Sequence, residues 1–170
     1  THASRRAWLI LAVLLLFSIA APLNQSKVPP ILPILMEAWG LPVGQAGLLM
    51  SLYAITGLVL ALPAGFIFHR VGYRWTGVLA GGSIALGAAL GALSQSFNLL
   101  LFSRAIEGIG TGFVAVMAPA VIAPWFPQRR GIALGIWATW VPLGLLTMLL
   151  VAPALASWGG WRSVWWFGCL

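Results

Sequence analysis

The sequence predicts an all-α integral membrane protein. Of its 170 residues, 61% are hydrophobic and only 6% are charged, whereas a typical soluble domain carries about 25% charged residues. The apolar residues form long runs, and a helix needs roughly 20 of them to cross the hydrocarbon core. These runs lack the alternation of apolar and polar side chains that a membrane β-barrel would show. Lipid, rather than water, is therefore the solvent expected around most of the surface.

Five segments are long and apolar enough to be complete membrane-spanning helices. They cover residues 7–26, 46–68, 75–93, 99–121 and 132–155, and the first has an open alternative end at residue 36. A sixth helix is expected to begin near Val164, and only its first seven residues lie within the sequence. The expected architecture is a six-helix bundle with five complete helices and the start of a sixth.

The basic residues predict the orientation in the membrane. Six arginines lie in loops at alternate helix ends, which must share one side: Arg5, Arg6, Arg70, Arg74, Arg129 and Arg130. The other side holds Arg162 and, if the first helix ends before it, Lys27. Because cytoplasmic loops carry an excess of Lys and Arg, we expect a multi-pass protein of the plasma membrane, the inner membrane in a bacterium, with a cytoplasmic amino terminus.

Other classes of function find little support in the composition. A nucleic-acid partner is not expected, because the basic residues are scattered between apolar runs instead of clustering on one wettable face. The single Cys169 excludes a disulfide within the chain, and His2 and His69 each stand alone. The sequence shows neither paired metal ligands nor a phosphate-binding loop or nucleophile elbow. We therefore expect no enzyme activity, no metal site and no cofactor.

Two ionisable residues lie within the fourth segment, where burial in lipid is costly. Such a group near the bilayer centre costs about 2.5–3.5 kcal/mol on insertion scales, so a functional role is the first hypothesis. Arg104 and Glu107 are three residues apart and therefore share one helical face. They are either a buried pair that only locks helices together or a cavity-facing pair. In the second case Arg104 attracts an anionic solute and Glu107, the only acid within a span, exchanges a proton.

The first segment carries Asn24, Gln25 and Lys27 before the prolines of residues 29–30. If the helix ends at residue 26, the Lys27 side chain extends to the membrane surface. If it continues to residue 36, as the apolar run 28–36 favours, these polar groups face a wet interior. Lys27 would then add positive charge beside a bound solute, and Asn24 and Gln25 would donate hydrogen bonds to it. The first and fourth helices, which carry the charge, are corresponding elements in a fold of two three-helix repeats.

Four motifs resemble the major facilitator superfamily of transporters. The loop of residues 65–74 matches the family's signature at Gly65, Arg70, Gly72 and Arg74, while His69 replaces the usual aspartate. Residues 104–112 are similar to the fourth-helix pattern of an arginine followed by closely spaced glycines. Residues 125–135 resemble the loop into the fifth helix, and residues 160–162 the entry to the sixth. Residues 24–30 and 135–142 look most like the branch that includes cyanate-transporter-like proteins.

This resemblance implies that residues 1–170 are the amino-terminal half of a twelve-helix secondary transporter. It implies alternating access of a central site for a small polar or anionic solute, with protons as a candidate second partner and the carboxy-terminal half completing the site. In such a protein Trp137 and Trp140 would either wall the cavity or simply face lipid and pack between helices. The loop residues of the signature would shape a cytoplasmic gate. The fifth helix departs from the family's antiporter motif, so antiport is not supported. The alternative is a non-transporting membrane scaffold or subunit assembled through glycine-lined helix faces.

Overall fold

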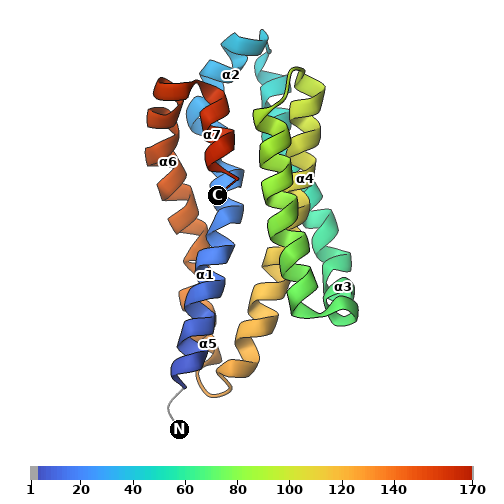
Figure 1. The fold of residues 1–170 in the computed structure, drawn as a ribbon, viewed down its shortest axis with the longest axis vertical. Coiled ribbons are helices and arrows are strands. Elements are labelled where there is room, and N and C mark those ends of the chain that lie inside the picture. Colours follow the sequence, from blue (N-terminus) through green and yellow to red (C-terminus); the bar gives the residue numbers. More distant parts are fainter. Residues whose placement is uncertain (1–3, 170) are drawn as a thin grey trace.

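The computed structural model describes residues 4–169, and helices account for nearly all of them (Figure 1). No strand is present in this part of the chain, so the predicted all-α class is confirmed. The elements, in chain order, are α1 Arg5–Ser26, the 3₁₀ turn η1 Pro29–Ile31, α2 Leu32–Trp39, α3 Val43–Ala92, α4 Phe97–Ile122, the 3₁₀ turn η2 Ala123–Trp125, α5 Arg130–Ala138, α6 Trp140–Gly159 and α7 Trp161–Phe167.

Helix α3 is a hairpin of two membrane-length arms. Its helical geometry is interrupted at Gly72, where φ is 77° and ψ is 171°. A positive φ costs glycine little because it has no Cβ, so this residue can reverse the chain. Figure 1 shows the first arm running to the end where the amino terminus lies and the second arm returning. The two arms correspond to the predicted second and third helices.

The first span extends from α1 through η1 to α2 and is broken in its middle. Ser4 caps α1 by accepting a hydrogen bond from the Ala7 amide at 3.2 Å. Helix α1 ends at Ser26, and the chain continues through η1 and α2 to Trp39, an apolar stretch of 35 residues in all. Lys27 therefore lies in the interior of this span and is fully buried, so it does not reach the membrane surface.

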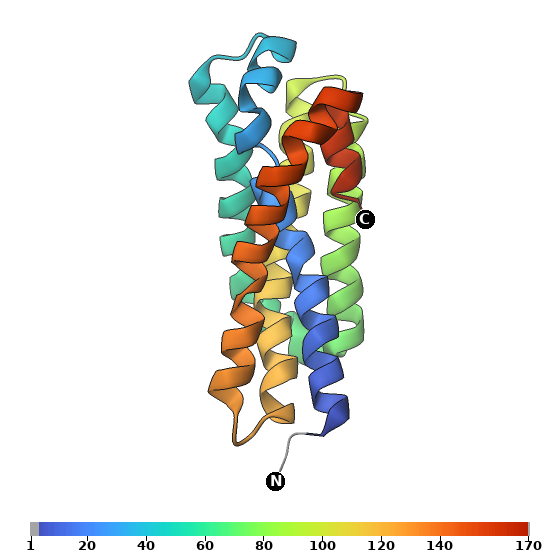
Figure 2. The same cartoon turned by 90° about the vertical axis from the view of Figure 1, so that its left-hand side faces the viewer.

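Helix α4 packs along both arms of α3 through glycine. A Cβ atom at Gly108 would lie 2.5 Å from the Tyr53 carbonyl oxygen, in the first arm. One at Gly110 would lie 2.4 Å from the Ala80 carbonyl oxygen, in the second arm. Small residues at such crossings let backbones approach closely within lipid. On the other side of the bundle, α1 packs against α6, where Gly144 meets Pro22 in the same way. Figure 2, turned by 90°, shows the resulting elongated bundle.

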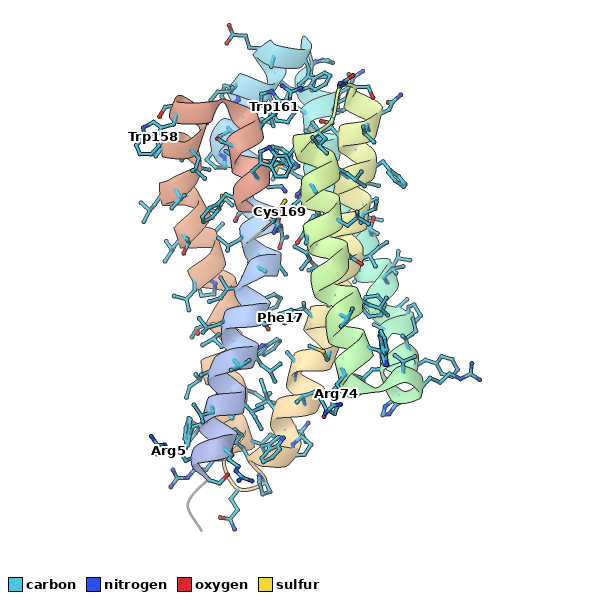
Figure 3. All side chains as sticks on the ribbon, viewed as in Figure 1. Arg5, Phe17, Arg74, Trp158, Trp161 and Cys169 are labelled. Carbon is cyan, nitrogen blue, oxygen red and sulfur yellow. The ribbon has the colours of Figure 1, made fainter. Side chains whose placement is uncertain are left out.

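The two ends of the bundle differ in charge. Arg5 and Arg74 lie at one end in Figure 3, and Trp158 and Trp161 lie at the other. The α4–α5 connection, which contains Arg129, is at the same end as Arg5 (Figure 1). This arrangement agrees with the predicted clustering of six arginines on one side.

We expect the arginine-rich end to face the cytoplasm. In a variant carrying Cys169→Ser as background, single cysteines at Arg70 and at Gln128 should react only with thiol reagents that cross the membrane. A cysteine at Gln95, which is exposed in the turn before α4, should react with impermeant reagents added outside. Labelling of position 128 by an impermeant reagent added outside would show that the orientation is the reverse of the one expected.

Candidate functional site

Three ionisable side chains meet in the interior of the bundle and form what we term the charged cluster: Lys27, Arg104 and Glu107. Each has 0% of its surface exposed. The Lys27 Nζ atom lies 2.5 Å from Glu107 Oε1, and the Arg104 guanidinium donates through Nη1 to Glu107 Oε2. Each carboxylate oxygen therefore faces its own cation. Two cations against one carboxylate give the cluster a formal charge of +1 when all three groups are ionised.

The helices explain how these residues come together. Arg104 and Glu107 share one face of α4 because they are three residues apart. A rise of 1.5 Å per residue places them about 10 and 15 Å from the Phe97 end of that helix. Lys27 follows immediately after the last residue of α1. The charged cluster therefore lies where the break in the first span meets the half of α4 nearest α2.

Asn24 connects the charged cluster to the short last helix. Its Oδ1 atom accepts a hydrogen bond from Lys27 Nζ at 2.9 Å. Its Nδ2 atom donates to the carbonyl oxygens of Ala20, at 2.9 Å, and Gly168, at 3.0 Å. This amide therefore uses donor and acceptor at once and is itself buried. Asn24 orients the lysine and is fully occupied by protein partners.

Gln25 has a different environment from its neighbour. Its side chain is exposed. Only its backbone carbonyl oxygen contacts the charged cluster, at 3.5 Å from Arg104 Nη2. A side-chain amide left in hydrocarbon without a hydrogen-bond partner is costly. We therefore expect this face of α1 to meet water or another protein segment instead of lipid tails.

Two aromatic rings complete the surroundings of the cations. The Arg104 guanidinium lies 4.4 Å from the ring centroid of Tyr53, and Lys27 Nζ lies 4.6 Å from that of Trp165. The Tyr53 hydroxyl donates to the Ala21 carbonyl oxygen at 2.7 Å and also contacts the Thr111 hydroxyl. Sequence reasoning did not single out these residues. A signal existed for Tyr53, because a hydroxyl within an apolar span needs a buried partner.

Trp137 and Trp140 lie apart from the charged cluster. Their rings stack on each other with centroids 5.3 Å apart. Trp137 donates through Nε1 to the hydroxyl of Ser18 at 3.0 Å, and Trp140 is buried among apolar side chains. Ser18 precedes Asn24 by six residues, or about 9 Å along α1. Trp137 therefore contacts α1 nearly two helical turns before Asn24, on the side toward Arg5.

The predicted gating residues lie in the turn of the α3 hairpin and just before it. Gly65 is in the first arm, with Val116 of α4 as its nearest neighbour. The Arg70 guanidinium lies 4.9 Å from the Phe66 ring centroid, and that of Arg74 lies 5.9 Å from the Tyr73 ring centroid. Both arginines are exposed and contact rings of their own hairpin. Gly72 supplies the left-handed backbone of the turn itself.

Comparison with known proteins agrees with a multi-pass membrane bundle. The family model described as Major Facilitator Superfamily matches residues 6–170, so the chain belongs to this family. It is 32% identical over 129 residues to the cyanate transport protein CynX of Escherichia coli K12, covering 76% of this chain and 34% of that protein. It is 35% identical over 156 residues to the uncharacterized MFS-type transporter Rv2994 of Mycobacterium tuberculosis H37Rv, covering 89% of this chain and 34% of that protein.

A solved structure supports the fold. The crystal structure of a D-xylose–proton symporter matches with a TM-score of 0.79 at 19% sequence identity, over 94% of this chain and 44% of the symporter. At this identity the likeness concerns the architecture alone. The chain spans about a third of the two curated relatives.

Proposed function

We propose that the protein is a secondary active transporter that moves a small anionic or polar solute together with a proton by alternating access. The observation that carries the proposal is the charged cluster, with two cations and one carboxylate buried between the first and fourth helices. An ionisable group within a membrane span is a functional candidate by default. Membership of the family favours a transporter over an enzyme or a scaffold.

The charge balance of the cluster links the proton to an anion. With Glu107 ionised, the formal charge is +1, and a proton on this carboxyl would raise it to +2. Unpaired charge in a low-dielectric interior is strongly unfavourable. A solute anion that arrives with the proton returns the charge to +1. Lys27 and Arg104 therefore supply the excess positive charge, and Glu107 serves as the proton carrier.

The exposed side chain of Gln25 marks the side from which a solute would approach. Gln25 lies on α1 next to the buried Asn24, and its backbone carbonyl oxygen contacts Arg104. The carboxy-terminal half of the transporter is the partner that would close this face. The name of the cyanate transport protein supports a small anion as the solute class, since that relative covers 76% of this chain.

Solute-dependent stabilisation tests the proposal. A ligand that binds only the native state at about 100 times its Kd raises stability by about 2.7 kcal/mol. In the purified full-length protein, cyanate, nitrate or formate should raise Tm, and the rise should grow as pH falls because a protonated Glu107 leaves more positive charge unpaired. Urea, a neutral molecule of similar size, is the control. Equal shifts with urea, or a rise in Tm that does not depend on pH, would contradict proton–anion symport.

The hairpin turn provides a separate prediction about gating. Gly72→Leu should reduce transport at least about tenfold while leaving solute affinity nearly unchanged, because a side chain in the left-handed region costs about 1–2 kcal/mol and the hairpin lies far from the charged cluster. Uptake into proteoliposomes and equilibrium binding measure the two quantities. Gly131→Leu is the matched control at the same end of the bundle, since a Cβ there meets nothing within 4 Å. Unchanged uptake in Gly72→Leu would reduce the loop to a topological anchor.

A further inference from the structure

The break in the first span leaves part of α1 without its usual hydrogen bonds. In an α-helix each carbonyl oxygen accepts from the amide four residues later. The positions four residues after Gln25 and Ser26 are Pro29 and Pro30, and proline has no amide hydrogen. Its ring also clashes with the carbonyl four residues earlier. Helix α1 accordingly ends at Ser26, and both Ser26 and the following Lys27 are buried.

Arg104 supplies donors to this end of α1 from the neighbouring helix. Its Nη1 atom lies 2.9 Å from the Asn24 carbonyl oxygen, and its Nη2 atom lies 3.5 Å from that of Gln25. Its Nε atom donates to the Leu49 carbonyl oxygen in α3 at 3.1 Å. A cation at the carboxyl end of a helix also opposes the partial negative charge there. One guanidinium thus joins the broken end of α1 to α3 and α4.

The guanidinium has a geometry that a lysine ammonium cannot copy. Its donors are fixed in one plane, so they reach several acceptors at once. Here those acceptors are three backbone carbonyl groups and Glu107, all provided by the protein. Lys27, in contrast, has three rotatable donors. It forms hydrogen bonds to Asn24 and Glu107 and lies beside the Trp165 ring. The two cations of the charged cluster therefore have unequal freedom to meet a solute.

We propose that Arg104 is a positioning residue that caps the proline-broken end of α1, and that Lys27 is the cation that meets the solute. The second half of this inference rests on the proposed function, and the first half does not. Since Lys27 comes directly after the capped end, loss of the cap would displace its ammonium group from Glu107. Arg104 then acts on solute binding through the backbone of α1.

The substitutions Arg104→Lys and Pro29→Ala test the cap. Arg104→Lys keeps the positive charge and removes the planar fork. In the full-length protein without solute, we expect the amides of residues 28–35 to exchange hydrogen for deuterium about tenfold faster in this variant, as lost bonds to a charged donor imply. Adding Pro29→Ala should return exchange to within about twofold of the parent, because the alanine amide can bond to the Gln25 carbonyl oxygen. Rescue through a restored amide is not expected if Arg104 merely contributes charge.

Pro153→Ala is the matched control, because Pro153 is another proline inside a spanning helix, α6, and is exposed. Unchanged exchange in Arg104→Lys, or equal rescue by the α6 proline substitution, would overturn the cap.

Cyanate-induced Tm shifts in the same variants test the part of the inference that concerns solute binding. If hydrogen exchange changes as expected but cyanate does not change Tm in any variant or in the parent, the proposed function is wrong and the cap is still supported. The proposal that Lys27 meets the solute is tested with Lys27→Gln. Hydrogen exchange in this variant should match the parent, but cyanate should no longer raise its Tm. A Tm rise as large as in the parent would overturn the proposal.

Discussion

Glu107→Gln is expected to lower the stability of the folded protein by about 3–5 kcal/mol, the cost typical of leaving a buried charge uncompensated. The loss of stability should exceed the loss caused by substituting either cation, because Glu107→Gln leaves both Lys27 and Arg104 without an anion. Arg104→Gln instead leaves one cation, Lys27, and one carboxylate, Glu107, so the formal charge of the remaining cluster is zero. Melting temperatures of the purified full-length variants measure the difference.

A double-mutant cycle separates the structural from the functional interpretation of the cluster. Combining Glu107→Gln with Lys27→Met removes one cation and should restore part of the lost stability. Combining it with Arg104→Gln provides the second cycle. Anions should also restabilise Glu107→Gln, since this variant mimics the protonated carboxyl. Recovery in the double mutants without any effect of anions would show that the cluster only locks the helices together. A Glu107→Gln variant as stable as the parent would contradict the buried site.

Gly110→Leu is expected to prevent assembly of the bundle. A Cβ atom there would lie 2.4 Å from the Ala80 carbonyl oxygen and 2.5 Å from Ile84 Cγ1. Overpacking typically costs about 1–3 kcal/mol, and more where, as here, backbone must move. The full leucine side chain would separate α4 from the second arm of α3. The yield of monodisperse protein and its Tm are the measurements.

Gly82→Leu is the matched control for this substitution. It lies in the second arm of α3, and a Cβ there meets nothing within 4 Å. Its yield and Tm should stay close to those of the parent. Equal losses in the two variants would indicate that glycine content, and not the close helix crossing, limits folding.

The fold could be predicted from the sequence because its main determinants are local. Apolar length defined the spans, and the signature loop of residues 65–74 follows the second span, where the structure reverses the chain at Gly72. Helical periodicity also placed Arg104 and Glu107 on one face. These features depend on neighbours within a few residues. The structure shifts the span ends by a few residues, as at α4, which begins at Phe97 instead of residue 99.

The partners of the charged residues depend on long-range packing and were less predictable. Lys27 meets Glu107 across 80 residues of sequence, which requires a particular rotation of α1 against α4. The same rotation buries Asn24 and exposes Gln25, although the two are adjacent and equally polar. Tyr53 and Trp165 enter the site from α3 and α7, which supply none of the three charged residues of the cluster. Their role follows from crossing geometry that hydropathy does not encode.

The separation between Lys27 and Glu107 also has a consequence for biogenesis. The lysine leaves the ribosome 80 residues before its carboxylate partner, an interval of about 4–16 s at ~5–20 residues per second. During this interval an ammonium group in the first span has no anion from the fourth. Entry of that span into lipid on its own is therefore disfavoured by the insertion cost of a charged residue. The first helix is expected to stay beside the translocon until the fourth emerges, so that the two partition into the bilayer as a neutralised unit.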